Sequence, residues 1–514
     1  AEYNIRLLPN CNTARKMEVP ADLPGVVIFL HGVNDPGASY ESVESGLCQG
    51  VNERLDRPDL IPGRYGAEFA AVKRLPLDKL DDKQQRVLDD PDTYLYRRDT
   101  DTPKTRSLMI PFYWGYRAAP DEIKRDENDE PARLRDQYQD IHNNRLDRHF
   151  AKGGGFFANA TNNLLDMYNE GFDKLIRHVA QTQLSNTLYM GKAPHRRYFI
   201  LAATRLAMLI GEIRRVSANE TITVMGHSQG TLISLLAQAM LVDQGKRCAD
   251  TLIMVDSPYS VLPKVTPKAH DTLTTLINIV SAVTANKHPK PALTELREHA
   301  TYFGRSGPRW SPEQGVRLDA EQTLTVFSER DNRGKVYLYF CPDDTTVALD
   351  DVEGIGTYGV PDSLPDGTAA MTALQPLSFY QRLWTKRHRD DAPVLVGKTP
   401  GPELLRAQGE PRYPGGRSAA AMLSQAPIAE QTTRLINAEA LNPPHAPQMF
   451  GGEARQGTPD SAGLDRPDAV SQSNALGNPA ARFQWCYVYN SPTRINLDKA
   501  RDGWNQEKLP GDQT

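Results

Sequence analysis

The 514-residue chain has few cysteines, and those present are unsuited to a disulfide framework or a metal site. There are five (Cys11, Cys48, Cys248, Cys341 and Cys486), an odd number, and they are scattered without metal-ligand spacing. We therefore expect synthesis in a reducing cytoplasm. The sequence offers no ligand set for a metal and implies no organic cofactor.

Long apolar runs and a large charge of one sign are also lacking. No window approaches the ~18 apolar residues of a transmembrane helix. The formal net charge of −4 is small for this length, so we expect no nucleic-acid partner. No basic leader followed by an apolar run opens the sequence, so we expect no secretory signal peptide. The 39% of hydrophobic and 24% of charged residues are typical of a globular protein with polar loops.

The most informative segment is Gly226-His227-Ser228-Gln229-Gly230. It follows a β-branched run at 221–225 and precedes an apolar segment at 231–237, a pattern that predicts a strand, a sharp turn and a buried helix. A serine between two glycines at such a turn is the nucleophile elbow of the α/β-hydrolases. The helix would then direct its partly positive N-terminus at the reaction centre. An ordinary glycine-rich turn is the alternative, and the flanking strand and helix favour the elbow.

Other segments predict strands and helices in alternation. Apolar runs predict strands at 26–30, 108–114, 252–255 and 336–340, and the apolar spacing over 205–216 predicts a helix. Such alternation indicates an α/β fold. We therefore expect an α/β-hydrolase with a mostly parallel central sheet flanked by helices, large inserted or lid regions and a loop-rich C-terminal region.

The expected hydrolase core is discontinuous and consists of residues 20–120 and 195–350. Residues 121–194, which include a charge-dense stretch, are interpreted as an insertion, and residues 351–514, rich in Pro, Gly and polar residues, as a loop-rich region that completes the hydrolase. The segment 258–304 carries an apolar stripe that either packs on the core or forms a lid helix that opens on lipid. The stripe comprises Leu273, Leu276, Ile277, Val280 and Val283.

Acyl transfer by a serine also requires donors that hold the oxyanion. We expect these donors to be the backbone N–H groups of Gln229, directly after the nucleophile, and of Val33, in the loop after the first buried strand. The alternative for the His31-Gly32 pair that precedes Val33 is a tight turn with a packed histidine.

The acid that orients the catalytic base should follow a later strand, in the chain order serine, acid, histidine. Asp343 and Asp344 follow the strand predicted at 336–340. We favour Asp344 because it stands three residues before Val347, the usual placement in an Asp-x-x-Val loop. Asp343 and Asp256 are the other candidates, and a solvated turn or helix cap is the non-catalytic alternative for the pair.

The base is the least determined member of the site, because only two of the eleven histidines follow Asp344. His445 lies in a proline-rich loop that could hold an imidazole over the elbow. His388 lies in a charged run typical of a solvated face. We expect His445 to be the base, with His388 and a histidine outside this chain as alternatives.

Five segments together resemble a known family. They are His31–Gly37, Pro111–Gly115, Phe156–Asn162, Gly226–Gly230 and Cys341–Asp344. They resemble the antibacterial lipase effectors delivered by bacterial type VI secretion, specifically the third Tle subfamily. The similarity covers roughly residues 20–390, and its most specific part is the segment that begins at His31.

The resemblance implies a phospholipase or lipase that cleaves acyl esters of membrane phospholipids in the periplasm of a rival cell. It also implies a cognate immunity protein, a secretion spike protein and a loading adaptor as partners, with export from the cytoplasm without a signal peptide. Ser228 maps to the family's nucleophile and Asp344 to its acid, whereas the histidine region is not recognisable. A non-lipid carboxylesterase or thioesterase and a non-catalytic binding scaffold are the alternatives.

Overall fold

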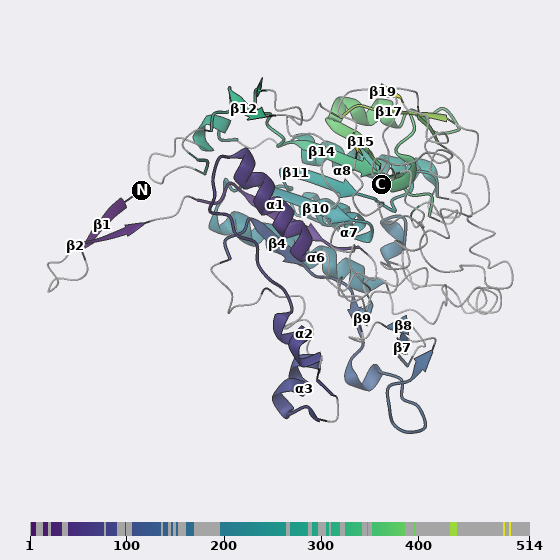
Figure 1. Ribbon diagram of the computed structural model, residues 1–514. Helices are drawn as coiled ribbons and strands as arrows, with labels where there is room; N and C mark the ends of the chain where they lie inside the picture. The colour runs from purple at the N-terminus through teal and green to yellow at the C-terminus, as the bar shows by residue number, and fades with distance from the viewer. Residues whose placement is uncertain are drawn as a thin grey trace, which may run out of the picture.

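Six parallel strands and one antiparallel edge strand form the central sheet in the part of the chain that the structure describes. Their order is β18-β15-β14-β11-β10-β3-β4 (Figure 1). The parallel strands are β3 (Val26–Leu30), β4 (Met109–Phe112), β10 (Ile222–His227), β11 (Thr251–Val255), β14 (Lys335–Phe340) and β15 (Phe379–Thr385), and the edge strand is β18 (Tyr487–Val488). This arrangement confirms the predicted α/β fold with a mostly parallel sheet.

The structure is a computed structural model, and it describes only part of the chain. The described residues are 2–6, 14–18, 22–32, 40–73, 75–76, 79–89, 98, 105–134, 137–141, 145–146, 151–152, 161–168, 196–263, 268–285, 290–296, 305–307, 310–318, 324–341, 347, 352–385, 394–396, 432–438, 487–488 and 493–494.

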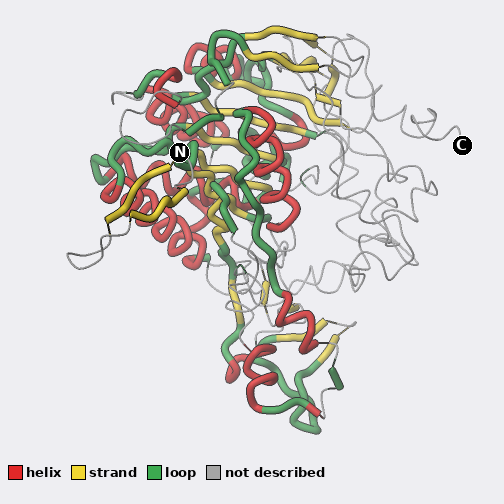
Figure 2. Tube along the Cα trace, turned by 60° about the vertical axis from the view of Figure 1, so that its left-hand side comes forward, coloured by secondary structure: helices red, strands yellow, loops and turns green. Residues whose placement is uncertain are grey.

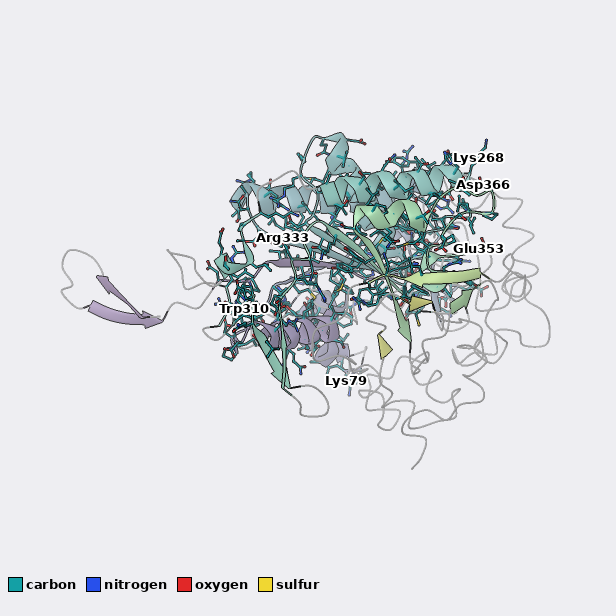
Figure 3. The ribbon with its side chains drawn as sticks, turned by 90° about the horizontal axis from the view of Figure 1, so that it is seen from above. Lys79, Lys268, Trp310, Arg333, Glu353 and Asp366 are labelled. Atoms are coloured by element: carbon teal, nitrogen blue, oxygen red, sulfur yellow. The ribbon has the colours of Figure 1, made fainter. Side chains whose placement is uncertain are left out.

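Helices cover both faces of the sheet (Figure 2). Helix α1 (Tyr40–Arg54) lies on one face, and α6 (Arg197–Val216), α7 (Gln229–Asp243) and α8 (Ala269–Ala285) lie on the other, as the view from above shows (Figure 3). Helix α7 packs against β3, β10 and β11 and also against α6 and α8. Because it has neighbours on several sides, its sequence is apolar around most of its circumference.

Burial on both faces explains the continuous apolar run of β3. Ile28 and Leu30 belong to the large core cluster between the sheet and the α6–α8 layer. Phe29 points to the opposite face and joins Tyr40 and Met109 beneath α1. Successive residues of a strand point to opposite faces, so a strand between two helical layers has no polar face.

The apolar stripe predicted within 258–304 lies on α8. Four of its members, Leu273, Leu276, Val280 and Val283, are at most 1% exposed, and Ile277 packs against the same core cluster. Helix α8 therefore follows the packed-core alternative, while the role of the remainder of 258–304 stays a prediction. In the described portion of the chain, no helix combines the length and apolar character needed to cross a membrane.

Smaller elements surround this framework. A hairpin of β1 (Glu2–Arg6) and β2 (Ala14–Glu18) projects from the body, and both views show α2 and α3 near β7 and β8, below the β4 edge (Figures 1 and 2). The other elements are α2 (Ala67–Lys73), α3 (Asp82–Asp89), β5 (Tyr116–Arg117), β6 (Arg133–Leu134), β7 (Gln137–Gln139), β8 (Arg145–Leu146), β9 (Ala151–Lys152), β12 (Gly315–Leu318), β13 (Leu324–Phe327), α9 (Ile355–Tyr358), α10 (Met371–Leu374), β16 (Val394–Val396), β17 (Thr432–Ile436) and β19 (Thr493–Arg494). Short 3₁₀ helices occupy Pro120–Glu122, Leu165–Tyr168, Leu293–Leu296 and Gln375–Leu377.

The order of the strands contains one reversal. After β3 the chain adds β4 on one side, and from β10 onwards it adds β11, β14 and β15 on the other side. The reversal lies between the neighbouring strands β3 and β10. In open parallel sheets, ligands bind at the carboxyl ends of the strands beside such a point.

Candidate active site

Ser228 occupies the sharp turn between β10 and α7, at the reversal in strand order. Its backbone has φ 50° and ψ −123°, a strained combination for a residue with a side chain. Its N–H donates to the Val255 carbonyl at 2.8 Å, and its carbonyl accepts from the Thr231 N–H at 3.0 Å and from Thr231 Oγ1 at 2.7 Å. These bonds hold the turn against both the next strand and the helix. Ser228 is half-buried, so part of the residue is accessible to solvent.

The two glycines of the elbow allow strand and helix to approach closely. A Cβ on Gly226 would lie 2.8 Å from the Gly230 carbonyl carbon and from the Thr231 nitrogen. A Cβ on Gly230 would lie 2.6 Å from the His31 carbonyl oxygen. Backbone atoms cannot move aside as a flexible side chain can, so both positions require glycine. The predicted strand, turn and helix around Ser228 are therefore confirmed.

Residues 31–32, which follow β3, reach Ser228 from the other side of the reversal. A Cβ on Gly32 would lie 3.0 Å from Ser228 Cβ and 2.9 Å from His227 Nδ1. The backbone of the His31-Gly32 pair is thus in contact range of Ser228, where an oxyanion loop has to be.

His31 is itself a packed histidine. Its side chain is fully buried, and its ring stacks on Trp114 with centroids 5.0 Å apart and on Tyr113 at 5.1 Å. Nδ1 lies 2.7 Å from the Gly32 carbonyl oxygen, and Trp114 Nε1 donates to the His31 carbonyl at 2.8 Å. The packed histidine of the alternative is therefore observed, whereas the oxyanion role of this loop stays a prediction.

Asp256, a lesser candidate for the acid, directly follows β11 next to the elbow. It has a positive φ of 47°, and its N–H donates to the Tyr339 carbonyl at 3.1 Å. Its Oδ2 lies 4.0 Å from Nε2 of His227, and both side chains are partly exposed. The two residues therefore lie close together at the carboxyl ends of the paired strands β10 and β11.

The loop that carries the favoured acid is anchored at the same edge of the sheet. Its described ends are Cys341, whose N–H donates to the Gly356 carbonyl at 2.7 Å, and Val347, whose carbonyl accepts from the Gly354 N–H at 3.1 Å. The N–H of Gly356 in turn donates to the carbonyl of Ser257 at 2.7 Å. Helix α9 thus ties both ends of this loop to the segment that follows Asp256.

Several predicted site residues lie outside the described residues. These are Val33, Asp343, Asp344, His388 and His445. Their roles remain predictions. Ser228, Gln229, His31, Gly32 and Asp256 are the sequence-derived candidates that the structure brings together at the end of β3, β10 and β11.

Sequence reasoning missed two features of this edge. Ser257 is buried, and its Oγ lies 2.6 Å from Thr231 Oγ1, which joins the post-β11 segment to the first turn of α7. The Gln229 side chain is also buried, and its Nε2 has no hydrogen-bond partner among described residues. An aligned Ser-Thr pair carries no local signal, since residues 231 and 257 meet only through the parallel pairing of β10 and β11.

A buried, uncharged tyrosine lies next to the site. Tyr259 is buried behind Ser257 and donates to the Thr272 carbonyl at 2.6 Å, and burial raises the pKa of its hydroxyl well above the ordinary value. It therefore stays neutral and links the site edge to α8. Across the described part of the chain, no group of three or more His, Cys, Asp and Glu side chains is arranged to hold a metal ion.

Comparison with known proteins adds two findings. Residues 23–361 match the family described as the T6SS Tle3 phospholipase effector domain, where T6SS denotes the type VI secretion system. The chain is 39% identical over 399 residues to the antibacterial effector protein Tle3 of Pseudomonas aeruginosa. That alignment covers 74% of this chain and 54% of the relative, so the chain spans about half the length of the relative that it matches.

Proposed function

Because this chain belongs to the family of Tle3 phospholipase effector domains of type VI secretion systems, we propose that it is a lipolytic serine hydrolase of the phospholipase A type. It would cleave acyl esters of membrane phospholipids and act as an antibacterial effector. The observation that carries the proposal is the strained Ser228 at the reversal between β3 and β10. Its Cβ lies 3.0 Å from the position that a Cβ added to Gly32 would occupy.

In the proposed reaction, Ser228 Oγ attacks the ester carbonyl carbon while a histidine takes its proton. His445 is our candidate for that base, and Asp344 would orient it. The negative oxygen of the tetrahedral intermediate would be held by the N–H groups of Gln229 and Val33, with the N-terminus of α7 adding a favourable dipole.

Collapse of this intermediate breaks the ester C–O bond. The histidine gives its proton to the departing lysophospholipid oxygen, which leaves as a hydroxyl, and the fatty acyl group stays on Ser228. Water, activated by the same histidine, then releases the fatty acid and restores the serine. Donors that are fixed before the reaction cost no reorganisation when the charge develops, which is why the anchored Gly32 and the rigid elbow support this chemistry.

The partners and the site of action follow from the family and are part of the proposal. We infer that the protein is made in the cytoplasm, exported through the type VI apparatus by a spike protein and a loading adaptor, and toxic in the periplasm of the target cell. A cognate immunity protein would protect the producer.

Hydrolysis of phospholipid vesicles, compared with short soluble esters, tests the reaction. The intact chain should release fatty acid from vesicles, and Ser228→Ala should not. Release from soluble esters alone would indicate a carboxylesterase, and equal activity in both forms would defeat the serine mechanism. Mass spectrometry of the products distinguishes a free fatty acid from a released headgroup.

Expression directed to the periplasm tests the biological role. Intact protein with an added export signal should stop growth, whereas the Ser228→Ala form and the cytoplasmic form should not. Equal toxicity of the intact and Ser228→Ala forms would favour a binding scaffold.

A further inference from the structure

A line of hydrogen bonds leads from the segment after β11 to the carbonyl group of Ser228. The Tyr259 N–H donates to Ser257 Oγ at 3.2 Å, and Ser257 Oγ lies 2.6 Å from Thr231 Oγ1. Thr231 Oγ1 in turn donates to the Ser228 carbonyl oxygen at 2.7 Å. Ser257 and Thr231 are fully buried, so solvent does not compete for these bonds.

The two ends of this line decide which hydroxyl donates in the middle. A carbonyl oxygen can only accept, so the one hydrogen of the Thr231 hydroxyl goes to Ser228. A backbone N–H can only donate, so Ser257 Oγ accepts from Tyr259 and keeps its own hydrogen. Ser257 therefore donates to Thr231 Oγ1. All the bonds run in one direction, and each strengthens the next because a hydroxyl that accepts a hydrogen bond becomes a better donor.

The last bond of the line holds the peptide that joins Ser228 to Gln229. In a planar trans peptide, the carbonyl oxygen and the following N–H point in opposite directions. The Ser228 oxygen is held toward α7 by Thr231 Oγ1 at 2.7 Å and by the Thr231 N–H at 3.0 Å. The N–H of Gln229, the first residue of α7, therefore points away from the body of the helix. That N–H is one of our candidates for the oxyanion donors.

We propose that Thr231 and Ser257 are positioning residues, which fix the direction of the Gln229 N–H through the hydrogen bond from Thr231 to the Ser228 carbonyl. This role rests on the proposed hydrolase function. Neither side chain touches the substrate, since both are fully buried. The backbone of Ser228 makes such support necessary, because its strained φ of 50° and ψ of −123° persist only where neighbouring groups hold them.

Merely structural hydroxyls would also be buried, so the test must separate the hydroxyl from the volume that the side chain fills. Thr231→Val keeps the shape of the side chain and loses its hydrogen bonds, whereas Thr231→Ser keeps the hydroxyl and loses a methyl group. Both variants should lower the melting temperature. Ser234→Ala is the matched control, because Ser234 is buried in α7 and donates to the Gly230 carbonyl at 2.8 Å, a bond of the same kind that does not involve Ser228.

We expect Thr231→Val to lower kcat on a soluble ester by ~10-fold with little change in KM, because complete loss of one oxyanion donor costs ~10²- to 10³-fold. Thr231→Ser and Ser234→Ala should retain kcat within ~3-fold of the intact chain, on the same scale. Equal kcat in Thr231→Val and Thr231→Ser, or a loss in Thr231→Val that only follows its unfolded fraction, would overturn the positioning role.

A double variant tests whether Ser257 acts through Thr231. Ser257→Ala leaves the bond from Thr231 to Ser228 in place and removes its reinforcement, so it should lower kcat less than Thr231→Val does. Added to Thr231→Val, it should cause no further loss of kcat, because both residues act through the same bond. Losses that multiply in the double variant would overturn the role of Ser257.

A structural measurement decides the inference independently of activity. Crystal structures of the two full-length Thr231 variants should show the Ser228 carbonyl rotated in Thr231→Val and unmoved in Thr231→Ser. An unmoved carbonyl in both variants overturns the proposal, even where hydrolysis is measured. If the intact chain hydrolyses no ester, the proposed function fails, and a rotated carbonyl still supports control of the Ser228–Gln229 peptide by Thr231.

Discussion

The amino ends and the carboxyl ends of β10 and β11 differ in how their buried polar groups are paired. At their amino ends, the fully buried Asp250 accepts from Ile222 N–H and from Arg214 Nη2 at 2.8 Å each through Oδ2, and from Arg247 through Oδ1. At their carboxyl ends, Ser228 and Asp256 both have positive φ, and the buried Gln229 amide nitrogen has no partner among described residues.

The difference separates stability from chemistry along the same strands. In Figure 3, Arg333 marks the amino end of the sheet and Glu353 the carboxyl end. At the amino ends, the buried Asp250 carboxylate is paired with arginines and is a structural feature. At the carboxyl ends, the strained backbone of Ser228 and Asp256 persists only because the surrounding residues hold it. We therefore expect changes at the amino end to reduce the free energy of unfolding and changes at the carboxyl end to reduce catalysis.

The largest expected effect is at Ser228. Ser228→Gly and Ser228→Ala should lower kcat/KM by ~10⁴-fold or more, because the proposed nucleophile is lost. Ser228→Gly should also raise the free energy of unfolding by ~1 kcal/mol, since strained φ and ψ values cost about 1–3 kcal/mol in a non-glycine residue. Ester hydrolysis and urea denaturation measure the two quantities.

The matched control for this prediction is Ser234→Ala, in α7, the helix that begins directly after Ser228. Ser234 is buried and donates to the Gly230 carbonyl at 2.8 Å, but it has no role in the proposed reaction. It should keep kcat/KM near that of the intact chain. Substantial hydrolysis by Ser228→Gly would contradict the assignment of the nucleophile.

The next effect is at the amino end, where Asp250→Asn should reduce the free energy of unfolding by ~3–5 kcal/mol, because it leaves buried arginines uncompensated. Burial already lowers the pKa of Arg214, and Asp250 opposes that effect. The kcat of the folded fraction should not change. Asp243→Asn, at the exposed end of α7, is the control and should be neutral. A lower kcat in folded Asp250→Asn would remove the proposed separation of the two ends.

A smaller effect is expected at Gly32. The added methyl group of Gly32→Ala would lie 2.9 Å from His227 Nδ1 and 3.0 Å from Ser228 Cβ, so it should displace the proposed oxyanion loop and lower kcat by ~10-fold. The melting temperature should change little. Gly50→Ala, where nothing lies within 4 Å of the new Cβ, should leave kcat unchanged and stabilise α1 slightly. Equal kinetics in the two variants would show that Gly32 is not close to the reacting atoms.

Elements with a local sequence signal could be predicted, whereas elements that depend on contacts between distant residues could not. The strand at 26–30 and the elbow were predictable because their signals are local: a run of apolar residues, and glycines around a serine. Strand β15 was not predicted, because it carries Gln381 and Arg382 in its interior. Gln381 is fully buried, and its partners Val360, Leu435 and Asn437 come from distant parts of the chain. The proposed base poses the same problem, since only tertiary structure could bring a distant histidine to Ser228.

The smallest predicted effect concerns pH and the amino end of the sheet. Burial alone would raise the pKa of Asp331, but its hydrogen bonds and charge interaction with Arg333, together with Lys290, lower that pKa below the ordinary value. A lowered pKa in the folded state means that the pair stabilises the fold above the unfolded pKa, about 3.9, and that this stabilisation is lost as the pH falls through the folded value.

The urea midpoint of the intact chain should therefore exceed that of Asp331→Asn by a constant amount between about pH 5 and 7, and the difference should shrink below about pH 4. Because Asp331 is 38% exposed, solvent screens the pair and the difference should be small. The kcat ratio of the two proteins should stay at one over the same pH range, since Asp331 lies at the end of the sheet remote from Ser228; a ratio that varied with pH would mean that the two ends are coupled.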